Sequence, residues 1–120
     1  MIQLSDSRII FEALLRRAEV FSKSLPQSQG ARKEGKTIIL TFIVDKKLPF
    51  DTERYRKENI DECAIQAYDK IFSGQDEVDL LLLDIRLGFS VLFWDGQELS
   101  EMEFTYRTTD LLFLIANSYN

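Results

Sequence analysis

Carboxylates are the most abundant residues in this chain that could do chemistry, and most of them lie in its second half. Residues 61–120 carry 12 Asp and Glu against 3 Lys and Arg, whereas residues 1–60 carry 8 against 12. Paired carboxylates can hydrolyse a glycosidic bond, and several that converge can hold a hard cation. Glu101 and Glu103 alternate along a predicted strand, which is typical of a solvated face. Linear spacing therefore predicts no metal site, no cofactor and no catalytic pair.

Asp84 is the carboxylate with the most unusual surroundings, because it interrupts an apolar stretch that is predicted to be a strand. A buried carboxylate needs a charged or hydrogen-bonding partner, and Arg86 follows two residues later on the same predicted face. We interpret the two as a structural ion pair, with a catalytic acid as the alternative. A lowered pKa of Asp84 favours the pair, and a strongly raised pKa favours the acid.

Residue types that commonly carry catalysis are scarce. Histidine is absent, which removes the commonest general base near neutral pH, the commonest zinc ligand and every Ser-His or Cys-His dyad. Cys63 lies in an apolar helical stripe and is interpreted as a small buried hydrophobe rather than a reactive thiol. The stretch 27–36 contains two glycines but lacks the spacing of a phosphate-binding loop. An enzyme is disfavoured, although carboxylate, lysine or tyrosine catalysis stays open.

Charge and cysteine usage bear on surroundings and partners. The net charge of −5 and the pI of about 4.8 disfavour direct binding of nucleic acid or of an anionic membrane. One cysteine cannot form an internal disulfide, no signal-peptide pattern is visible, and no apolar run approaches the roughly 20 residues of a membrane span. We therefore expect a soluble, cytoplasmic protein. Because the acidic half contains most of the predicted strands, we also expect a negative patch on or beside the sheet.

The elements that must position these residues follow from hydrophobic periodicity. Apolar runs and period-2 alternation predict strands at 37–44, 78–86, 89–94 and 100–106. Helical spacing predicts helices at 4–25, 60–72 and 111–117, the second extendable back to Asp51 and the third with a last strand as its alternative. Asn59 followed by Glu62 resembles a capping box, and Ser73-Gly74 predicts a left-handed helix end. The polar stretch 27–36 is predicted to be a loop.

Together these elements predict one α/β (α+β) domain over residues 1–120, in the order α-β-α-β-β-β-α, with helices packed on a four-stranded mixed sheet. The strands before and after the central helix should be parallel if they are neighbours. The last three strands should form an antiparallel meander. Leu87-Gly88 supplies its first turn, and Asp95-Gly96 favours a two-residue type I′ hairpin as its second.

Trp94, beside the second turn, is the candidate anchor for a protein partner, with packing on the meander as its alternative. Aromatic residues amid carboxylates are typical of protein interfaces. The predicted partner-binding residues are Trp94, Asp95, Glu98, Glu101 and Glu103. They favour a small acidic inhibitor of the immunity or antitoxin type, which neutralises a cationic protein such as a nuclease toxin by occlusion.

Two other functions are weighed beside this one. A small enzyme or ligand-binding domain would hold a pocket between the sheet and helix 4–25, with Asp84, Tyr68 or Tyr106 as its polar groups. A homo-oligomer or assembly subunit would use the second face of the sheet. Apolar residues on both faces of the meander exceed what three helices are expected to cover, and an uncovered face would seek a partner. The element order itself carries no function.

Overall fold

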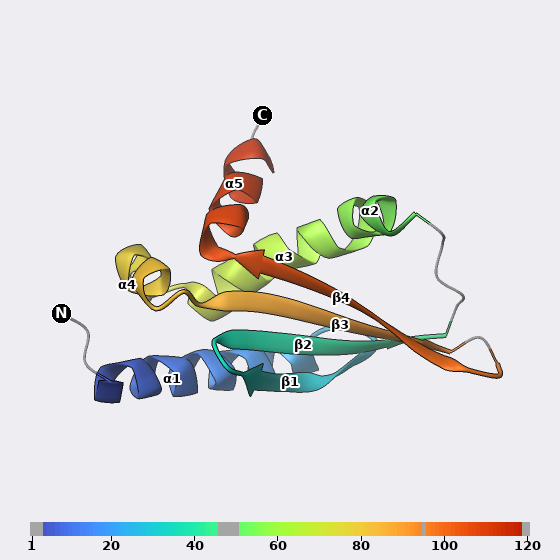
Figure 1. Ribbon diagram of the computed structural model, residues 1–120, viewed down its shortest axis with the longest axis horizontal. Coiled ribbons are helices and arrows are strands. Elements are labelled where there is room, and N and C mark those ends of the chain that lie inside the picture. The colour runs from blue at the N-terminus through green and yellow to red at the C-terminus, as the bar shows by residue number, and fades with distance from the viewer. Residues whose placement is uncertain (1–3, 46–50, 95, 119–120) are drawn as a thin grey trace.

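The computed structural model describes residues 4–45, 51–94 and 96–118, with side chains from residue 7 onward. Within them lies a four-stranded mixed sheet with the order β1-β2-β3-β4, packed with helices (Figure 1). The strands are β1 (Ser28–Glu34), β2 (Thr37–Val44), β3 (Arg86–Trp94) and β4 (Leu99–Arg107). The helical elements are α1 (Leu4–Lys23), α2 (Thr52–Tyr55), η1 (Arg56–Ile60), α3 (Asp61–Ala67), η2 (Tyr68–Phe72), α4 (Glu77–Leu82) and α5 (Thr108–Ser118). The predicted α/β class and mixed sheet are confirmed.

The sheet joins two antiparallel hairpins through a parallel centre. β1 pairs with β2 and β3 with β4 in antiparallel fashion, whereas β2 and β3 run parallel from Thr37 opposite Arg86 to Val44 opposite Phe93. Parallel neighbours need a crossover connection, and the helices from α2 to α4 form it. The predicted parallel pairing of 37–44 is therefore confirmed, but its partner is β3.

Residues 78–86 are a helix and its exit, so the predicted strand at this position is wrong. The Asp76 side chain caps α4 by accepting a hydrogen bond from the Val78 amide at 2.7 Å. Only one leucine of the run, Leu80, is fully buried, whereas Leu82 is 69% exposed. A run with a single buried side lacks the two covered faces that a central strand needs.

The exit from α4 has the two hydrogen bonds of a Schellman motif. The Ile85 amide donates to the Leu80 carbonyl and the Asp84 amide to the Leu81 carbonyl, both at 3.1 Å. Asp84 takes the left-handed conformation that this motif requires, with φ of +52°. Ile85 and Leu80 are both buried, as the motif's hydrophobic contact requires. The chain thereby turns from helix into β3 within two residues.

β1 occupies most of the stretch 27–36, so the predicted loop is also wrong. Apart from a register shift between Ser28 and Gly30, its backbone pairs with β2 from Ser28 opposite Phe42 to Glu34 opposite Thr37. The two residues between them, Gly35 and Lys36, form the turn, where Gly35 has φ of +58°. An edge strand of this kind is held by its backbone hydrogen bonds and needs no continuous apolar side. Because its residues are polar, hydrophobic periodicity did not predict it as a strand.

The predicted meander is a single hairpin, because Leu87 and Gly88 lie inside β3 rather than in a turn. A Cβ atom at Gly88 would lie 3.0 Å from Thr37 Cγ2 and 3.2 Å from Ile39 Cγ1. Glycine is thus placed here for close packing between strands. The β3–β4 hairpin itself is confirmed.

The loop that closes the β3–β4 hairpin is longer than predicted. Trp94 pairs with Leu99, so residues 95–98 connect the strands and the predicted two-residue turn is wrong. Asp95 lies outside the described residues.

The helix predicted at 60–72 extends back to Thr52, as its alternative start anticipated. Asp51 caps it through a hydrogen bond from the Arg54 amide at 3.0 Å, so the capping box predicted at 59–62 is wrong. Two π-helical segments, η1 and η2, interrupt it. Each π turn adds one residue, which brings apolar residues five positions apart onto one side, as with Tyr55 and Ile60.

The remaining helix predictions concern the end of the helix over 52–72 and the helices at 4–25 and 111–117. The helix over 52–72 ends at Ser73, whose ψ of 133° is extended. Gly74 has φ of +90° and the Gln75 amide donates to the Phe72 carbonyl at 3.1 Å, so the chain leaves through a type II turn after the helix rather than through the predicted left-handed cap. The predicted helices at 4–25 and 111–117 are confirmed as α1 and α5.

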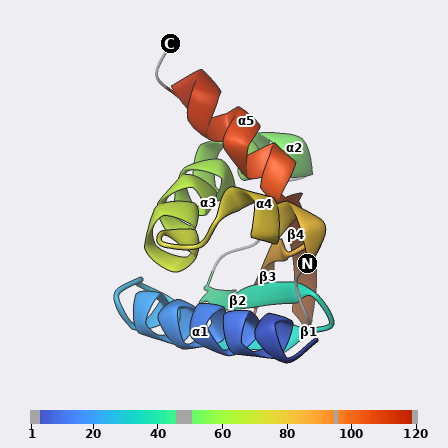
Figure 2. The same cartoon turned by 90° about the vertical axis from the view of Figure 1, so that its left-hand side faces the viewer.

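The helices share one hydrophobic core with one face of the sheet. In Figure 2, α3 lies between α1 and α5, to the left of β3 and β4. The fully buried sheet residues of this core are Ile38, Leu40, Leu87, Phe89, Val91 and Tyr106, and the helices contribute Leu14, Ala18, Ala64, Ala67, Ile71, Leu80 and Leu111. Side chains on the other face of the strands take no part in it.

Candidate functional site

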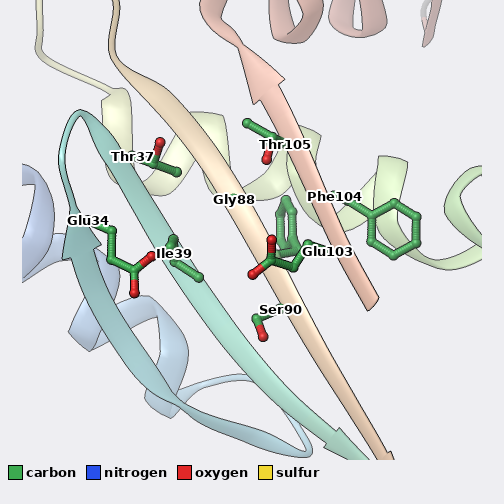
Figure 3. A pocket seen from close by; sticks show the side chains of 9 residues that line it. Glu34, Thr37, Ile39, Gly88, Ser90, Glu103, Phe104 and Thr105 are labelled. Carbon is green, nitrogen blue, oxygen red and sulfur yellow. The ribbon is translucent and has the colours of Figure 1, made fainter. Parts of the chain in front are cut away.

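The open face is the face of the sheet opposite the helices. Strand alternation and register place on it Arg32 and Glu34 of β1; Thr37, Ile39, Thr41 and Ile43 of β2; Arg86, Gly88, Ser90, Leu92 and Trp94 of β3; and Leu99, Glu101, Glu103, Thr105 and Arg107 of β4. None of these residues belongs to the helix-covered core. Figure 3 looks onto this face, with helices behind the strands. An uncovered second face was expected from the sequence, and the described residues leave it uncovered.

A shallow depression of about 160 Å³ lies in the middle of the open face. Gly88 forms its floor, because a glycine leaves the backbone of β3 bare. Figure 3 shows the carboxylates of Glu34 and Glu103 on either side of the Ile39 side chain. The depression therefore has an apolar and main-chain base between two acidic walls that come from opposite ends of the sheet order.

Hydrogen bonds fix the positions of Glu101 and Glu34, two of the carboxylates around this depression. Ser90, only 2% exposed, donates its hydroxyl hydrogen to Glu101 Oε1 at 2.7 Å. Arg32 Nε donates to Glu34 Oε1 at 3.1 Å, and its Nη1 donates to Thr41 Oγ1 at 2.8 Å. Around the depression, the carboxylates of Glu34, Glu101 and Glu103 thus lie near one guanidinium, that of Arg32, and this part of the open face is acidic. The other two guanidiniums of the face, those of Arg86 and Arg107, lie at the end where β3 begins.

The proximity of the two β4 glutamates raises the pKa of Glu103 above its ordinary value. The largest cause is a hydrogen bond with Glu101, followed by repulsion from the charge of Glu101; Glu34 adds to this repulsion and Arg32 opposes it. Ionising both carboxyls is therefore costly. A cation placed over the pair would remove part of this cost.

An apolar strip lies beside the acidic centre, toward the end of the sheet where β3 turns into β4. Trp94 is 43% exposed and Leu99, its cross-strand partner, is 56% exposed. Leu92 pairs with Glu101, so the strip and the carboxylates are direct neighbours. Trp94 is thus partly exposed, while more than half of its surface is covered beside Leu99 on the β3–β4 hairpin.

The structure brings three of the five predicted partner-binding residues together. Trp94, Glu101 and Glu103 share the open face, and Glu98 is exposed in the adjoining loop. Asp95, as noted, lies outside the described residues.

Sequence reasoning missed the residues of β1 and the floor of the depression. Glu34 and Arg32 were assigned to a loop, and Gly88 to a turn. A signal was available, because Gly35-Lys36 between a polar stretch and an apolar strand resembles a two-residue hairpin turn.

The groups expected to serve an enzyme are each engaged with a different charged residue. Asp84 Oδ2 accepts a hydrogen bond from Arg86 Nη2 at 3.0 Å, which lowers the pKa of Asp84. The interpretation as a structural ion pair is thus confirmed, although it follows a helix rather than lying within a strand.

The two candidate tyrosines are similarly occupied. Tyr106 donates its hydroxyl hydrogen to Asp61 Oδ1 at 2.5 Å, and burial followed by this bond raises its pKa far above the ordinary value. Burial, and then Glu77, raises the pKa of Tyr68. Because both pKa values are raised above the ordinary value of tyrosine, both hydroxyls are protonated at neutral pH.

Leu14 and Ala18 fill the core between the sheet and α1, where both are fully buried. A hollow of about 510 Å³ opens farther along, between α1 and the end of β1, but none of the polar groups expected in such a pocket, Asp84, Tyr68 and Tyr106, lines it. A hollow of about 220 Å³ lies beyond the end of α1 and is bordered by Tyr55 and Cys63. Burial raises the pKa of Cys63 to about 11. The thiol is therefore protonated at neutral pH and behaves as the small hydrophobe predicted.

In the part of the chain that the structure describes, no three acidic or cysteine side chains are grouped so as to hold a metal ion. Among the same residues, no helix combines the length and apolar character needed to cross a membrane. Comparison of the chain with protein-family models, with curated proteins and with solved structures finds no match. A function must therefore be argued from the site itself.

Proposed function

We propose that this protein is an inhibitor of a cationic protein, such as a nuclease toxin, and that it works in the immunity or antitoxin manner by covering its partner's basic surface with the open face. The observation that carries the proposal is the juxtaposition of Trp94 and Leu99 with Glu101 and Glu103 on a sheet face free of the described helices. An aromatic anchor bordered by polar side chains is common in protein interfaces, and a border of one charge sign favours a partner of the opposite sign.

The two parts of the face have different tasks in this proposal. Trp94 and Leu99 supply affinity, because an exposed aromatic side chain gains most when a partner removes it from water. Glu34, Glu101 and Glu103 supply attraction at a distance and select a basic partner, because complementary charge speeds encounter more than it tightens the complex. A nuclease fits this description, since it presents Lys and Arg to hold phosphate.

The depression over Gly88 gives the proposal a specific contact. The aliphatic stem of a lysine or arginine would lie against Ile39 and the bare backbone of Gly88. Its charged end would then reach Glu34 or Glu103, where it would ease the repulsion between the glutamates of β4. Such a contact favours arginine where two carboxylates must be reached at once.

Charge reversal on the open face tests the proposal. A partner is first captured from the native cell with the wild-type chain, and its association rate is then measured over a range of salt concentrations. Glu101→Lys/Glu103→Lys should slow association by about tenfold or more and flatten its salt dependence.

The matched control is Glu19→Lys/Glu62→Lys, which changes the net charge equally at exposed positions on α1 and α3. We expect this control to associate nearly as fast as the wild type. Unaltered affinity and salt dependence in the open-face variant would reject the proposal, and so would an equal loss in both variants.

A further inference from the structure

The outer edge of β4 is a long, regular strand edge with a single neighbour. β4 lies at the end of the sheet order and pairs only with β3. Its register with β3 runs one residue for one residue from Leu99 to Arg107. In the described part of the chain, no backbone–backbone hydrogen bond joins β4 to any element other than β3. At its C-terminal end the Arg107 amide donates to Asp110 Oδ2 of α5 at 2.8 Å. Proteins usually protect such edges, because unpaired N–H and C=O groups invite another strand.

The opposite edge of the sheet differs. The register of β1 with β2 shifts between Ser28 and Gly30, and Gly30 has φ of +124°. A bulge of this kind twists an edge away from pairing. The two edges are therefore unequal, and β4 is the one suited to accept a strand.

β4 is also held firmly from its inner side. Phe104 stacks on Tyr55 with ring centroids 6.2 Å apart, and Tyr106 is buried and bonded to Asp61. Figure 1 shows α5 leaving the sheet at the C-terminal end of β4. The half that carries Glu101 and Glu103 lies farther from this helix. A rigid, preformed edge lowers the ordering cost of adding a strand.

The charges on β4 select what can pair there. Glu101 and Glu103 project from the same face two residues apart, which in a strand is about 6.8 Å. Antiparallel self-pairing centred on Phe104 would put Glu101 opposite Arg107, but over residues 101–107 only. The register that overlaps all of β4 is centred on residue 103 and puts Glu103 opposite Glu103, which disfavours full-length pairing of two copies; centring on residue 101 or 102 also puts a glutamate opposite a glutamate. Like charges in that position are destabilising, whereas opposite charges stabilise a cross-strand pair.

We propose that the free edge of β4 binds an extended segment of the partner protein that carries basic residues at every second position, so that the segment adds to the sheet as a fifth strand. This inference rests on the proposed function and specifies how the cationic partner docks. Main-chain hydrogen bonds to β4 provide the register, and alternate Lys or Arg side chains face Glu101 and Glu103.

A synthetic peptide tests the edge directly. The probe is a capped peptide as long as β4 that alternates lysine and valine, and its binding to the whole protein is measured by titration calorimetry. Two N-methylated forms carry the methyl groups on the lysines or on the valines, respectively. Only one of these two sets of N–H groups can face β4. We expect one form to bind as the parent does and the other to bind at least about tenfold more weakly, through the loss of several hydrogen bonds.

The matched protein variant is Glu101→Gln/Glu103→Gln, which should weaken binding of the parent peptide by about tenfold while leaving the difference between the two methylated forms. Equal binding of both methylated forms, or no binding of the parent peptide, overturns the edge proposal while the charge-reversal test of the open face still stands. A mass that rises with protein concentration also overturns it, since the edge would then be occupied by another copy.

Discussion

The two glutamates of β4 are the residues whose surroundings differ most from those of ordinary surface carboxylates. Glu101 is held by Ser90, a nearly buried hydroxyl, while Glu103 has a raised pKa because of its hydrogen bond with Glu101 and the charge of that residue. When one of two neighbouring carboxyls is ionised, its negative charge makes ionisation of the other less favourable. The folded chain tolerates this repulsion at neutral pH, and binding of a cation would reduce it.

Replacing Glu103 by glutamine should stabilise the folded chain at neutral pH. Since the folded state raises the pKa of Glu103, it binds this proton more tightly than the unfolded state, and the resulting stability is lost as pH rises through that pKa. The Glu103→Gln variant should melt above the wild type at pH 7, and the difference should shrink as pH falls below the ordinary pKa of glutamate, about 4.3. Thermal melts across this pH range measure it.

Glu62→Gln on α3 is the control for any general effect of removing one negative charge. The profile of this control should lack the gap that opens with rising pH in Glu103→Gln. Parallel profiles for the two variants would contradict the assigned repulsion.

At the scale of elements, the end of α4 decides how the second half of the chain folds. Asp84 at φ of +52° directs the chain out of the helix, and its neighbour Ile85 closes the Schellman motif on Leu80. β3 can then begin at Arg86 and run beside β2. The point at which α4 ends thus sets the register of β3, in which Gly88 lies beside Thr37 and Ile39 of β2.

The left-handed conformation of Asp84 predicts an order of stability between two variants. Asp84→Gly and Asp84→Ala both lose the ion pair with Arg86, so comparing them isolates the backbone. Glycine adopts positive φ without a Cβ clash, so Asp84→Gly should be more stable than Asp84→Ala by about 1 kcal/mol. Urea unfolding of both variants measures the difference, and equal midpoints would count against a left-handed residue here.

At the scale of the whole molecule, helices on one side leave a sheet face and a strand edge on the other side for a partner. Apolar residues are also exposed on the helical side, among them Leu82 of α4 and Phe113 of α5, each 69% exposed. Acidic residues also accompany the exposed leucines of α4, but on the open face the apolar and acidic side chains lie on one hairpin, where Leu92 pairs with Glu101 and Ser90 with Glu103. Charge complementarity is thus available on the open face to define a partner.

Two exposed aromatic residues allow the two surfaces to be compared. Trp94→Ala on the open face should weaken partner binding by about 2 kcal/mol, chiefly through faster dissociation, as truncation of an interface anchor does. Phe113→Ala on α5 should leave binding unchanged. Phe113→Ala should alter the free energy of unfolding by less than about 0.5 kcal/mol, because Phe113 is 69% exposed. Trp94→Ala should lower it by about 1 kcal/mol, because Trp94 is 43% exposed and has Leu99 as its cross-strand partner. Dissociation rates and urea unfolding together measure these effects, and stronger loss in Phe113→Ala would move the interface to the helices.

The sequence by itself determined the elements whose own residues specify them. The amphipathic spacing of 4–25 predicted α1, the β-branched run at 37–44 predicted β2, and the apolar stripe of 60–72 predicted the crossover helix. The β3–β4 hairpin followed from alternation together with the turn signal at Asp95-Gly96, and the exposure of Glu101 and Glu103 from alternation. These features depend on neighbours within a few residues, which a sequence displays directly. The mixed sheet is confirmed, although the crossover predicted between 37–44 and 78–86 is wrong in its second strand, because β2 pairs with β3.

Only the tertiary structure decided the rest of the candidate site. β1 is polar and forms because β2 supplies the partners for its backbone hydrogen bonds. Glu34 and Glu103 therefore lie on the same face only because of strand pairings between residues far apart in the chain. The leucine run at 80–83 suits helix and strand equally well, and the caps at Asp76 and Asp84 settle it as helix. The composition of a segment indicates which of its side chains can be buried. Backbone pairing across the whole sheet decides which strands become neighbours, and it thereby decides which carboxylates share a face.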